Sequence, residues 1–303
     1  MRPAPLQQSS EYAQALSAIG ADVVVDRQLC LRRKLPVVGT IGYLPRGNWP
    51  ARPPTGMTLI NATDADQDNA IRAAGALPLM TPQTLAVLEL GGTETDWLTA
   101  MHGKWRNRLR AALDGPLVLH SAEFCSKSHT WLLDRETAQR ADRGYTTLPH
   151  ALIRAYPQDQ TLVIEAHLND VPVAAMLFLL HPPGATYHIG WSGPEGRKAN
   201  AHNLILWHAM HHLQLRGITH LELGTLDSIN APGLARFKLG SGAKPLKLGH
   251  SWLYLPRLAP LFRAIRRVRG FPSGLLSKGS IGGPRTSQDT PHGSAQHRNY
   301  RPR

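Results

Sequence analysis

Residues 222–242 read ELGTLDSINAPGLARFKLGSG, and the rest of the chain is organised around this stretch. It follows a predicted buried strand over residues 218–223. Its charged and amide side chains are Glu222, Asp227, Asn230, Arg236 and Lys238. A long irregular loop inside a compact domain is usually functional or disordered, and the apolar residues within this one argue against disorder. We therefore expect a functional loop. A plain polar connection between a strand and a helix is the alternative.

The length of 303 residues predicts about two domains. The hydrophobic content of 42% predicts a globular protein with a buried core. Cys30 and Cys125 lie far apart in sequence, so we expect neither a disulfide framework nor a zinc site. The N-terminus lacks the apolar core of a signal peptide. No apolar run reaches the ~18 to 20 residues of a membrane span. These features favour a reducing, cytoplasmic location.

The formal net charge of +13 is concentrated near the C-terminus. Residues 257–303 hold ten Lys and Arg side chains and one acid, Asp289. We expect a basic helix over residues 256–271, followed by a disordered basic tail over residues 272–303, whose composition cannot bury enough apolar surface to fold. Such a tail is commonly only solvated, but an anionic lipid surface, RNA or a phosphorylated substrate could each use it.

The first part of the chain predicts a helix, a three-stranded meander and a second helix-containing segment. The predicted elements are a helix over 9–19, strands over 23–25, 29–32 and 37–43, a helix over 64–74, a strand over 83–90 and a helix over 93–113. Along the last helix Trp97, Met101, Trp105 and Leu109 form one apolar stripe, which predicts its buried face.

After Asp114-Gly115-Pro116 the pattern begins again, which indicates a domain boundary. Strands over 161–168, 171–180 and 185–191 form a predicted antiparallel meander, with Asn169-Asp170 as a hairpin turn. A helix over 203–215 and strands over 218–223 and 246–255 follow. Helices around mixed sheets make the predicted fold class α/β.

Several common types of active site are not indicated. His208 and His212 have the i, i+4 spacing of helical zinc ligands, but the acid of an HExxH motif is missing, so we expect no metal site. The nucleophile elbow, the Walker A loop and the dinucleotide fingerprint are also absent from the sequence. Hydrolase, kinase and dehydrogenase activities therefore lack support.

Residues 190–200 read GWSGPEGRKAN and lie between a predicted strand and a helix N-terminus, where an anion is favoured. The order of meander, strand, turn, helix and strand resembles the GNAT acyltransferase fold, in which this turn holds the pyrophosphate of the donor. The glycine-rich motif of acetyl-coenzyme A users is not matched, because residues 197–202 read RKANAH.

Three further motifs resemble the FemABX, or FemAB-like, branch of that superfamily: YLPRG at 43–47, KWRNRLR at 104–110 and GLARFK at 233–238. FemABX proteins consist of two tandem GNAT-like domains and move an aminoacyl group from tRNA to an amine. The resemblance covers about residues 9–255. It implies mixed sheets flanked by helices, with an abbreviated N-terminal GNAT-like domain over 1–116, which residues 256–270 could complete, and a C-terminal one over 117–255.

The resemblance also implies roles for individual residues. Lys238 would stabilise the oxyanion of a tetrahedral intermediate. Asp227 or Glu222 could accept the proton of the attacking amine, or the substrate could do so itself. The expected donor-binding or substrate-binding residues are Arg46, Lys104, Arg106, Asn107, Arg110, Tyr187, Trp191, Arg236 and Phe237. Solvation is the alternative for the charged residues, and strand packing on one common face is the alternative for Tyr187 and Trp191.

The sequence therefore predicts an acyl- or aminoacyltransferase that forms an amide on an amine acceptor, with a cell-envelope precursor as one candidate. It needs no tightly bound cofactor, and its donor is aminoacyl-tRNA, acyl-coenzyme A or an acyl carrier. We expect it in the cytoplasm, with peripheral contact to the inner face of the membrane through residues 257–303. The alternative is a non-catalytic GNAT-like scaffold that binds RNA or an anionic membrane through the same region.

Overall fold

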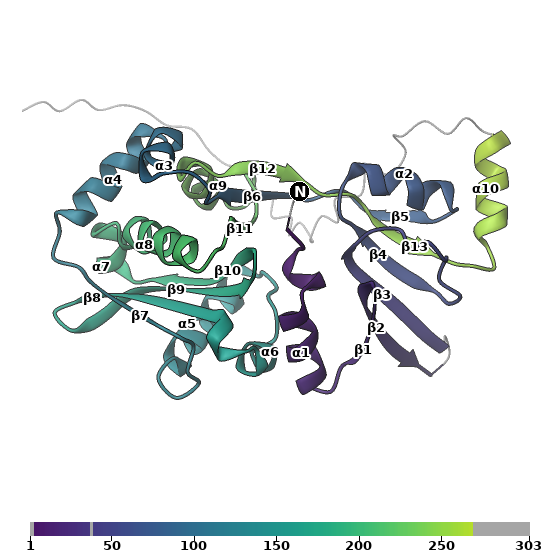
Figure 1. Cartoon of the computed structure of the whole chain (residues 1–303), viewed down its shortest axis with the longest axis horizontal. Helices are drawn as coiled ribbons and strands as arrows, with labels where there is room; N and C mark the ends of the chain where they lie inside the picture. Colours follow the sequence, from purple (N-terminus) through teal and green to yellow (C-terminus); the bar gives the residue numbers. More distant parts are fainter. Residues whose placement is uncertain (1–2, 37–38, 269–303) are drawn as a thin grey trace, which may run out of the picture. The chain divides into compact units, whose positions relative to one another are not determined.

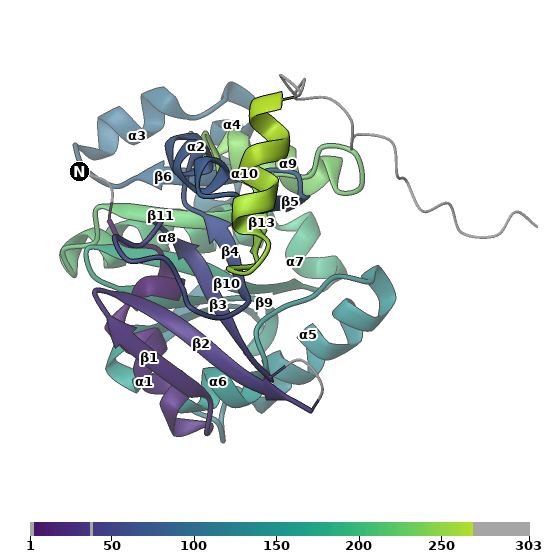
Figure 2. The same ribbon diagram turned by 90° about the vertical axis from the view of Figure 1, so that its right-hand side faces the viewer.

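Two β-sheets organise the chain in the computed structural model, which describes residues 3–36 and 39–268 (Figure 1). The first sheet has six strands (Figure 2). Their spatial order is β1 (Asp22–Asp26), β2 (Gln28–Leu35), β3 (Gly39–Gly47), β4 (Thr58–Ala62), β13 (Ser251–Tyr254) and β5 (Leu77–Met80). The β3 and β4 strands are parallel and the other neighbours are antiparallel, so this sheet is mixed.

The second sheet has seven strands and holds the stretch with which the sequence analysis began. Their spatial order is β12 (Lys244–Lys247), β6 (Thr84–Glu89), β11 (His220–Thr225), β10 (Gly184–Ser192), β9 (Val171–His181), β8 (Thr161–Leu168) and β7 (Val118–Ala122). The β10 and β11 strands are parallel and the other neighbours are antiparallel. The predicted fold class, mixed sheets flanked by helices, is confirmed.

Helices pack on both sheets (Figure 1). They are α1 (Ser10–Ala18), α2 (Ala65–Ala73), α3 (Glu94–Ala100), α4 (Gly103–Leu113), α5 (Thr130–Arg143), α6 (His150–Ala155), α7 (Pro194–Lys198), α8 (Ala201–Leu215), α9 (Pro232–Gly240) and α10 (Ala259–Val268). Short 3-10 turns cover Leu6–Gln8 and Gln158–Gln160. The largest apolar core joins α3, α4 and α8 to one face of the second sheet. Residues of α5 and α6 form a separate core on its other face.

The predicted long helix over 93–113 is two helices. Met101 and His102 have extended backbone angles, and the N–H of His102 donates to the carbonyl of Gly240 at 2.9 Å. This contact with α9 replaces the continuing helical hydrogen bond. The predicted apolar stripe is nevertheless buried along both helices, since Trp97, Met101, Trp105 and Leu109 are each at most 4% exposed.

The predicted strand over 246–255 is divided between the two sheets. Its beginning lies in β12 of the second sheet and its end in β13 of the first, where Trp252 is fully buried. The chain therefore returns to the first sheet after completing the second. The predicted Asn169-Asp170 hairpin turn is confirmed, and both residues have the positive φ angles that such a tight turn requires.

The chain passes from the first sheet to the second between β5 and β6, and the domain boundary predicted after residue 116 stays a prediction. The β6 strand and helices α3 and α4 share the core of the second sheet because Leu88, Trp97 and Trp105 pack there. The basic helix predicted over 256–271 is described as α10, and the predicted disordered tail over 272–303 lies outside the described residues. None of the helices described has the length and apolar character needed to cross a membrane.

Candidate active site

Strands β10 and β11 separate partway along their length. They are paired in parallel over three positions, Gly184 with His220, Ala185 with Leu221 and Thr186 with Glu222. Beyond Glu222 the β11 strand has no further register partner on β10, although β10 continues to Ser192 paired with β9. The carboxyl ends of these two strands therefore diverge, and the stretch over residues 222–242 begins at the point of divergence.

A β-bulge after Tyr187 places Tyr187 and Trp191 on opposite faces of the sheet. Tyr187 packs against Phe178 and the core under α8, whereas Trp191 packs against Trp131 and the core under α5. The sequence analysis expected Tyr187 and Trp191 to share one face of the strand, and this expectation is wrong. A regular strand would place both residues on one side, but the extra residue of a bulge reverses the alternation.

Lys238 is a buried cation within residues 222–242. It lies on α9 with 4% of its surface exposed, and its Nζ donates to the carbonyl of Thr225 at the end of β11, at 2.8 Å. A side chain on Gly224 would begin 3.6 Å from that nitrogen. Burial lowers the pKa of the Lys238 ammonium from 10.5 to about 8, because the charged form loses its contact with solvent.

The ammonium of Lys238 is still protonated at neutral pH and retains donor capacity. A lysine ammonium has three N–H donors. Among the described residues, the Thr225 carbonyl is the one acceptor for the N–H groups of Lys238. The remaining donors are available to an oxygen atom that develops negative charge beside the end of β11.

Phe237 fixes the position of α9 relative to α4 and α8. Its ring lies 6.0 Å from that of Trp105 and 6.1 Å from that of His202, measured between centroids. Nε2 of His202 lies 2.9 Å from the carbonyl oxygen of Trp191 on β10. A chain of contacts therefore runs from β10 through α8 and Phe237 to the helix that carries Lys238.

The turn between β10 and α8 forms the short helix α7. Gly196 in α7 approaches β9 so closely that an added Cβ would overlap the carbonyl oxygen of Val173. Lys198 pairs with Glu195, and Arg197 donates to the carbonyl of Ser192. Gly196 therefore allows α7 to pack closely against β9. The groups of this turn that remain available to bind an anionic donor are the first backbone N–H groups of α8.

Arg46 and Glu222, predicted as a donor-binding residue and a candidate base, form an ion pair. Nη1 of Arg46 lies 2.6 Å from Oε2 of Glu222, and the two side chains are 9% and 15% exposed. Arg46 has a positive φ of 47° at the end of β3, and Thr63 donates to its carbonyl. The carboxylate of Glu222 is therefore already engaged by a side chain of the protein.

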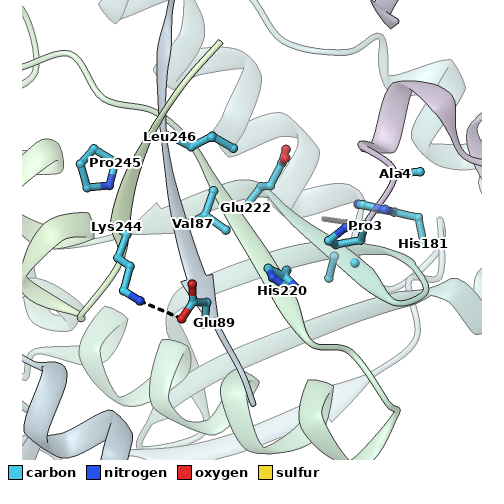
Figure 3. A pocket seen from close by; sticks show the side chains of 12 residues that line it. Pro3, Ala4, Val87, Glu89, His181, His220, Glu222, Lys244, Pro245 and Leu246 are labelled. Carbon is cyan, nitrogen blue, oxygen red and sulfur yellow. Dashed lines mark hydrogen bonds and ion pairs between the residues drawn. The ribbon is translucent and has the colours of Figure 1, made fainter. Parts of the chain in front are cut away.

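Glu222 also lines a half-open cavity of about 430 Å³ (Figure 3). The cavity lies over the first half of β11, and its other lining residues include Glu89, His181, His220 and Lys244. The close-up shows the 2.8 Å ion pair between Lys244 and Glu89 at its edge. The sequence analysis did not single out these four residues, since they become neighbours through strand pairing and carry no local motif.

Asp227 organises the loop after β11. Its carboxylate accepts hydrogen bonds from the N–H groups of Ile229 and Asn230 at 3.0 and 2.8 Å, and from the Asn230 side chain at 2.7 Å. The Asn230 hydrogen bonds lower the pKa of the Asp227 carboxyl, with a smaller contribution from Ile229. Such an aspartate stabilises a turn and is poorly suited to accept a proton.

The polar side chains of α4 are exposed or engaged elsewhere on the helix pair, and their predicted role in binding stays a prediction. Arg106 donates to the carbonyl of Leu98 at 2.8 Å, which caps the end of α3. Lys104, Asn107 and Arg110 are exposed, as is Arg236 on α9. Among the residues expected to bind substrates, the structure thus links Phe237 and Trp191 to the surroundings of Lys238, and it pairs Arg46 with Glu222.

Helix α8 carries the two histidines whose spacing resembles that of helical zinc ligands. His208 and His212 lie close together on α8, with ring centroids 4.4 Å apart. Across residues 3–36 and 39–268, no group of three or more His, Cys, Asp or Glu side chains is arranged to hold a metal ion.

Residues 96–245 match the model of a protein family described as an acetyltransferase (GNAT) domain. This segment contains the diverging strands, the turn before α8 and the helix that carries Lys238. The match to the GNAT superfamily is thus established over this segment, and the resemblance expected from the sequence is confirmed. No curated protein matches the chain in sequence.

Solved structures extend the similarity beyond this segment. The crystal structure of FemX aligns with a TM-score of 0.68 at 13% identity, over 86% of this chain and 94% of that chain. The C-terminal domain of a protein assigned as a lysylphosphatidylglycerol synthetase from Agrobacterium fabrum aligns with a TM-score of 0.54 at 12% identity, over 89% and 95%.

A conserved protein of unknown function from Bacteroides thetaiotaomicron VPI-5482 also aligns, with a TM-score of 0.54 at 13% identity, over 80% of this chain and 89% of that chain. At these identities the similarity establishes the fold alone. The predicted likeness to the FemAB-like branch is confirmed at that level, and the chain has a GNAT-type acyltransferase fold.

Proposed function

We propose that the protein transfers an acyl or aminoacyl group from an activated ester or thioester to an amine and forms an amide. The observation that carries this proposal is the buried ammonium of Lys238 at the point where β10 and β11 diverge. Its one protein acceptor is a neutral carbonyl, so its positive charge is not cancelled by a protein acid within the described residues.

The reaction proceeds by addition and elimination. The lone pair of a neutral amine attacks the donor carbonyl, and the carbonyl oxygen becomes an oxyanion that Lys238 stabilises by charge and hydrogen bonding. Collapse of the intermediate breaks the bond to the leaving oxygen or sulfur. The proton lost by the amine leaves with that group as an alcohol or thiol, so the reaction needs no external oxidant or reductant.

In this proposal, the donor enters where β10 and β11 diverge, and its phosphate groups approach the first turn of α8. Trp191 and Phe237 support this entrance by their contacts with His202. The basic residues of α4, together with Arg236, remain candidates for contacts with the distal part of a large anionic donor such as tRNA.

We propose no protein base for the amine proton. Glu222 is held by Arg46, and Asp227 is held by the turn that it stabilises. Both were candidates for this role, and the carboxylate of each already has a partner within the protein. A proton path through the substrates themselves, or directly to the leaving group, agrees better with this arrangement.

The donor can be identified by incubating the full chain with an amine mixture and either aminoacyl-tRNA or acyl-coenzyme A, and measuring amide products by mass spectrometry. Product from aminoacyl-tRNA, together with tRNA affinity that falls steeply with salt, supports an aminoacyl donor. Thermal stabilisation by coenzyme A without tRNA binding supports an acyl-coenzyme A donor. Amide formation from neither donor in such mixtures contradicts the proposed function.

A non-catalytic scaffold that acts through its basic C-terminus makes a different prediction. If the protein is a transferase, deletion of residues 272–303 leaves amide formation largely intact. If it is a binding scaffold, the same deletion abolishes its function, and the Lys238→Ala variant behaves as wild type.

A further inference from the structure

We infer that α10 is a docking surface for an anionic lipid bilayer. Three large apolar side chains at the start of this helix are solvent-exposed, Leu258 at 43%, Leu261 at 54% and Ile265 at 40%. The N–H of Phe262 donates to the carbonyl of Leu258, so Leu258 is part of the first helical turn. The three positions follow the i, i+3, i+7 spacing of a single helical stripe.

The opposite side of α10 contacts the turn that follows α2. Ala259 is 1% exposed, and a Cβ added to Gly75 would lie 2.5 Å from the Ala259 carbonyl oxygen. Arg263 donates to the carbonyl of Ala74 at 3.2 Å. These contacts lie on the other side of the helix from Leu261, since successive residues rotate by about 100°. Leu261 therefore points away from these contacts.

The charge around this stripe favours a negatively charged bilayer over a neutral apolar partner. Arg257, next to Leu258, is exposed, whereas Arg263 contacts Ala74 on the attached side. In sequence, residues 257–303 contain ten Lys and Arg side chains and one acid. A short amphipathic helix with apolar residues on one face and basic residues around it is typical of a segment that lies in the lipid interface.

The test is binding of the full chain to vesicles, measured by flotation. We expect binding to mixed phosphatidylcholine and phosphatidylglycerol vesicles and little binding to pure phosphatidylcholine. The Leu261→Gln/Ile265→Gln variant is expected to bind about tenfold more weakly or worse, because it loses the inserted apolar surface. Leu215→Gln, at an 88% exposed leucine at the end of α8, is the matched control and binds as wild type.

Undiminished vesicle binding by the Leu261→Gln/Ile265→Gln variant overturns the inference. Equal binding to neutral and anionic vesicles also overturns it. A third contradicting result is a protein that binds no vesicles but forms a dimer, if the Leu261→Gln/Ile265→Gln variant dissociates that dimer. RNA binding that needs Arg266 and Arg267 but not Leu261, in a chain that ignores vesicles, also overturns it. Transfer to a soluble amine is measured in parallel, so loss of lipid binding is distinguishable from loss of catalysis.

Discussion

The guanidinium of Arg46, at the end of β3, donates to the carboxylate of Glu222 on β11 and joins the two sheets through a 2.6 Å ion pair. The residues are 176 positions apart. Both side chains are largely removed from solvent, so each depends on the other for compensation of its charge. Loss of one partner would therefore leave the other charge uncompensated between the two sheets.

Replacement of Arg46 by alanine is expected to lower the free energy of unfolding by about 3 kcal/mol, because it leaves the carboxylate of Glu222 unpaired in a poorly solvated place. Urea denaturation measures this change. The double variant Arg46→Ala/Glu222→Ala should be less destabilised than the sum of the single variants. A coupling free energy near zero would show that the pair does not join the sheets energetically.

The sequence predicted which side chains of a helix are buried better than it predicted which distant segments of the chain contact each other. The stripe of Trp97, Met101, Trp105 and Leu109 is local, so its burial followed from helical spacing. The break at His102 was not predictable, because it depends on the carbonyl of Gly240 in a distant helix. The division of residues 246–255 between two sheets likewise depends on neighbours that are remote in sequence.

The candidate site was predictable where a motif is contiguous. The Phe237-Lys238 pair has one residue packed beside α8 and the other buried at the end of β11. The pairing of Arg46 with Glu222 was not expected, because no local signal relates the two positions. The opposite faces of Tyr187 and Trp191 depend on a bulge, which alternating polarity alone does not reveal.

A methyl group at Gly190 is expected to destabilise the second sheet. An added Cβ there would overlap the hydroxyl of Tyr187, so Gly190→Ala should cost about 2 kcal/mol or more. Gly91→Ala is the control, since a Cβ at Gly91 meets open space. In the Tyr187→Ala background the Gly190 substitution should cost little. An equal cost in both backgrounds, measured by chemical denaturation, would contradict this explanation.

Substitutions at Asp227 separate a turn residue from a general base. Asp227→Asn keeps an oxygen that can accept the N–H groups of Ile229 and Asn230, whereas Asp227→Ala removes it. We expect the asparagine variant to retain most of the rate of amide formation and the alanine variant to lose about tenfold through disorder of the loop. Equal and severe losses in both variants would instead assign Asp227 as the base.

The pH dependence of stability reports on the buried charge of Lys238. Its pKa is about 8 in the folded protein and 10.5 for the ordinary side chain, so between these values the unfolded state binds more protons. Stability should therefore rise with pH across this window relative to Lys238→Met, by at most ~3 kcal/mol. Unfolding free energies at pH 7 to 10 measure the difference, and a difference that does not change with pH contradicts burial of the ammonium.

The central claim is that the Lys238 ammonium stabilises the oxyanion of acyl transfer. The most direct measurement is the single-turnover rate of amide formation by Lys238→Ala with saturating donor, followed by mass spectrometry. We expect a loss of about 100- to 1,000-fold, with unchanged donor affinity and cooperative unfolding, and no loss for the exposed control Lys247→Ala. A Lys238→Ala variant that forms amide at the wild-type rate would contradict the claim.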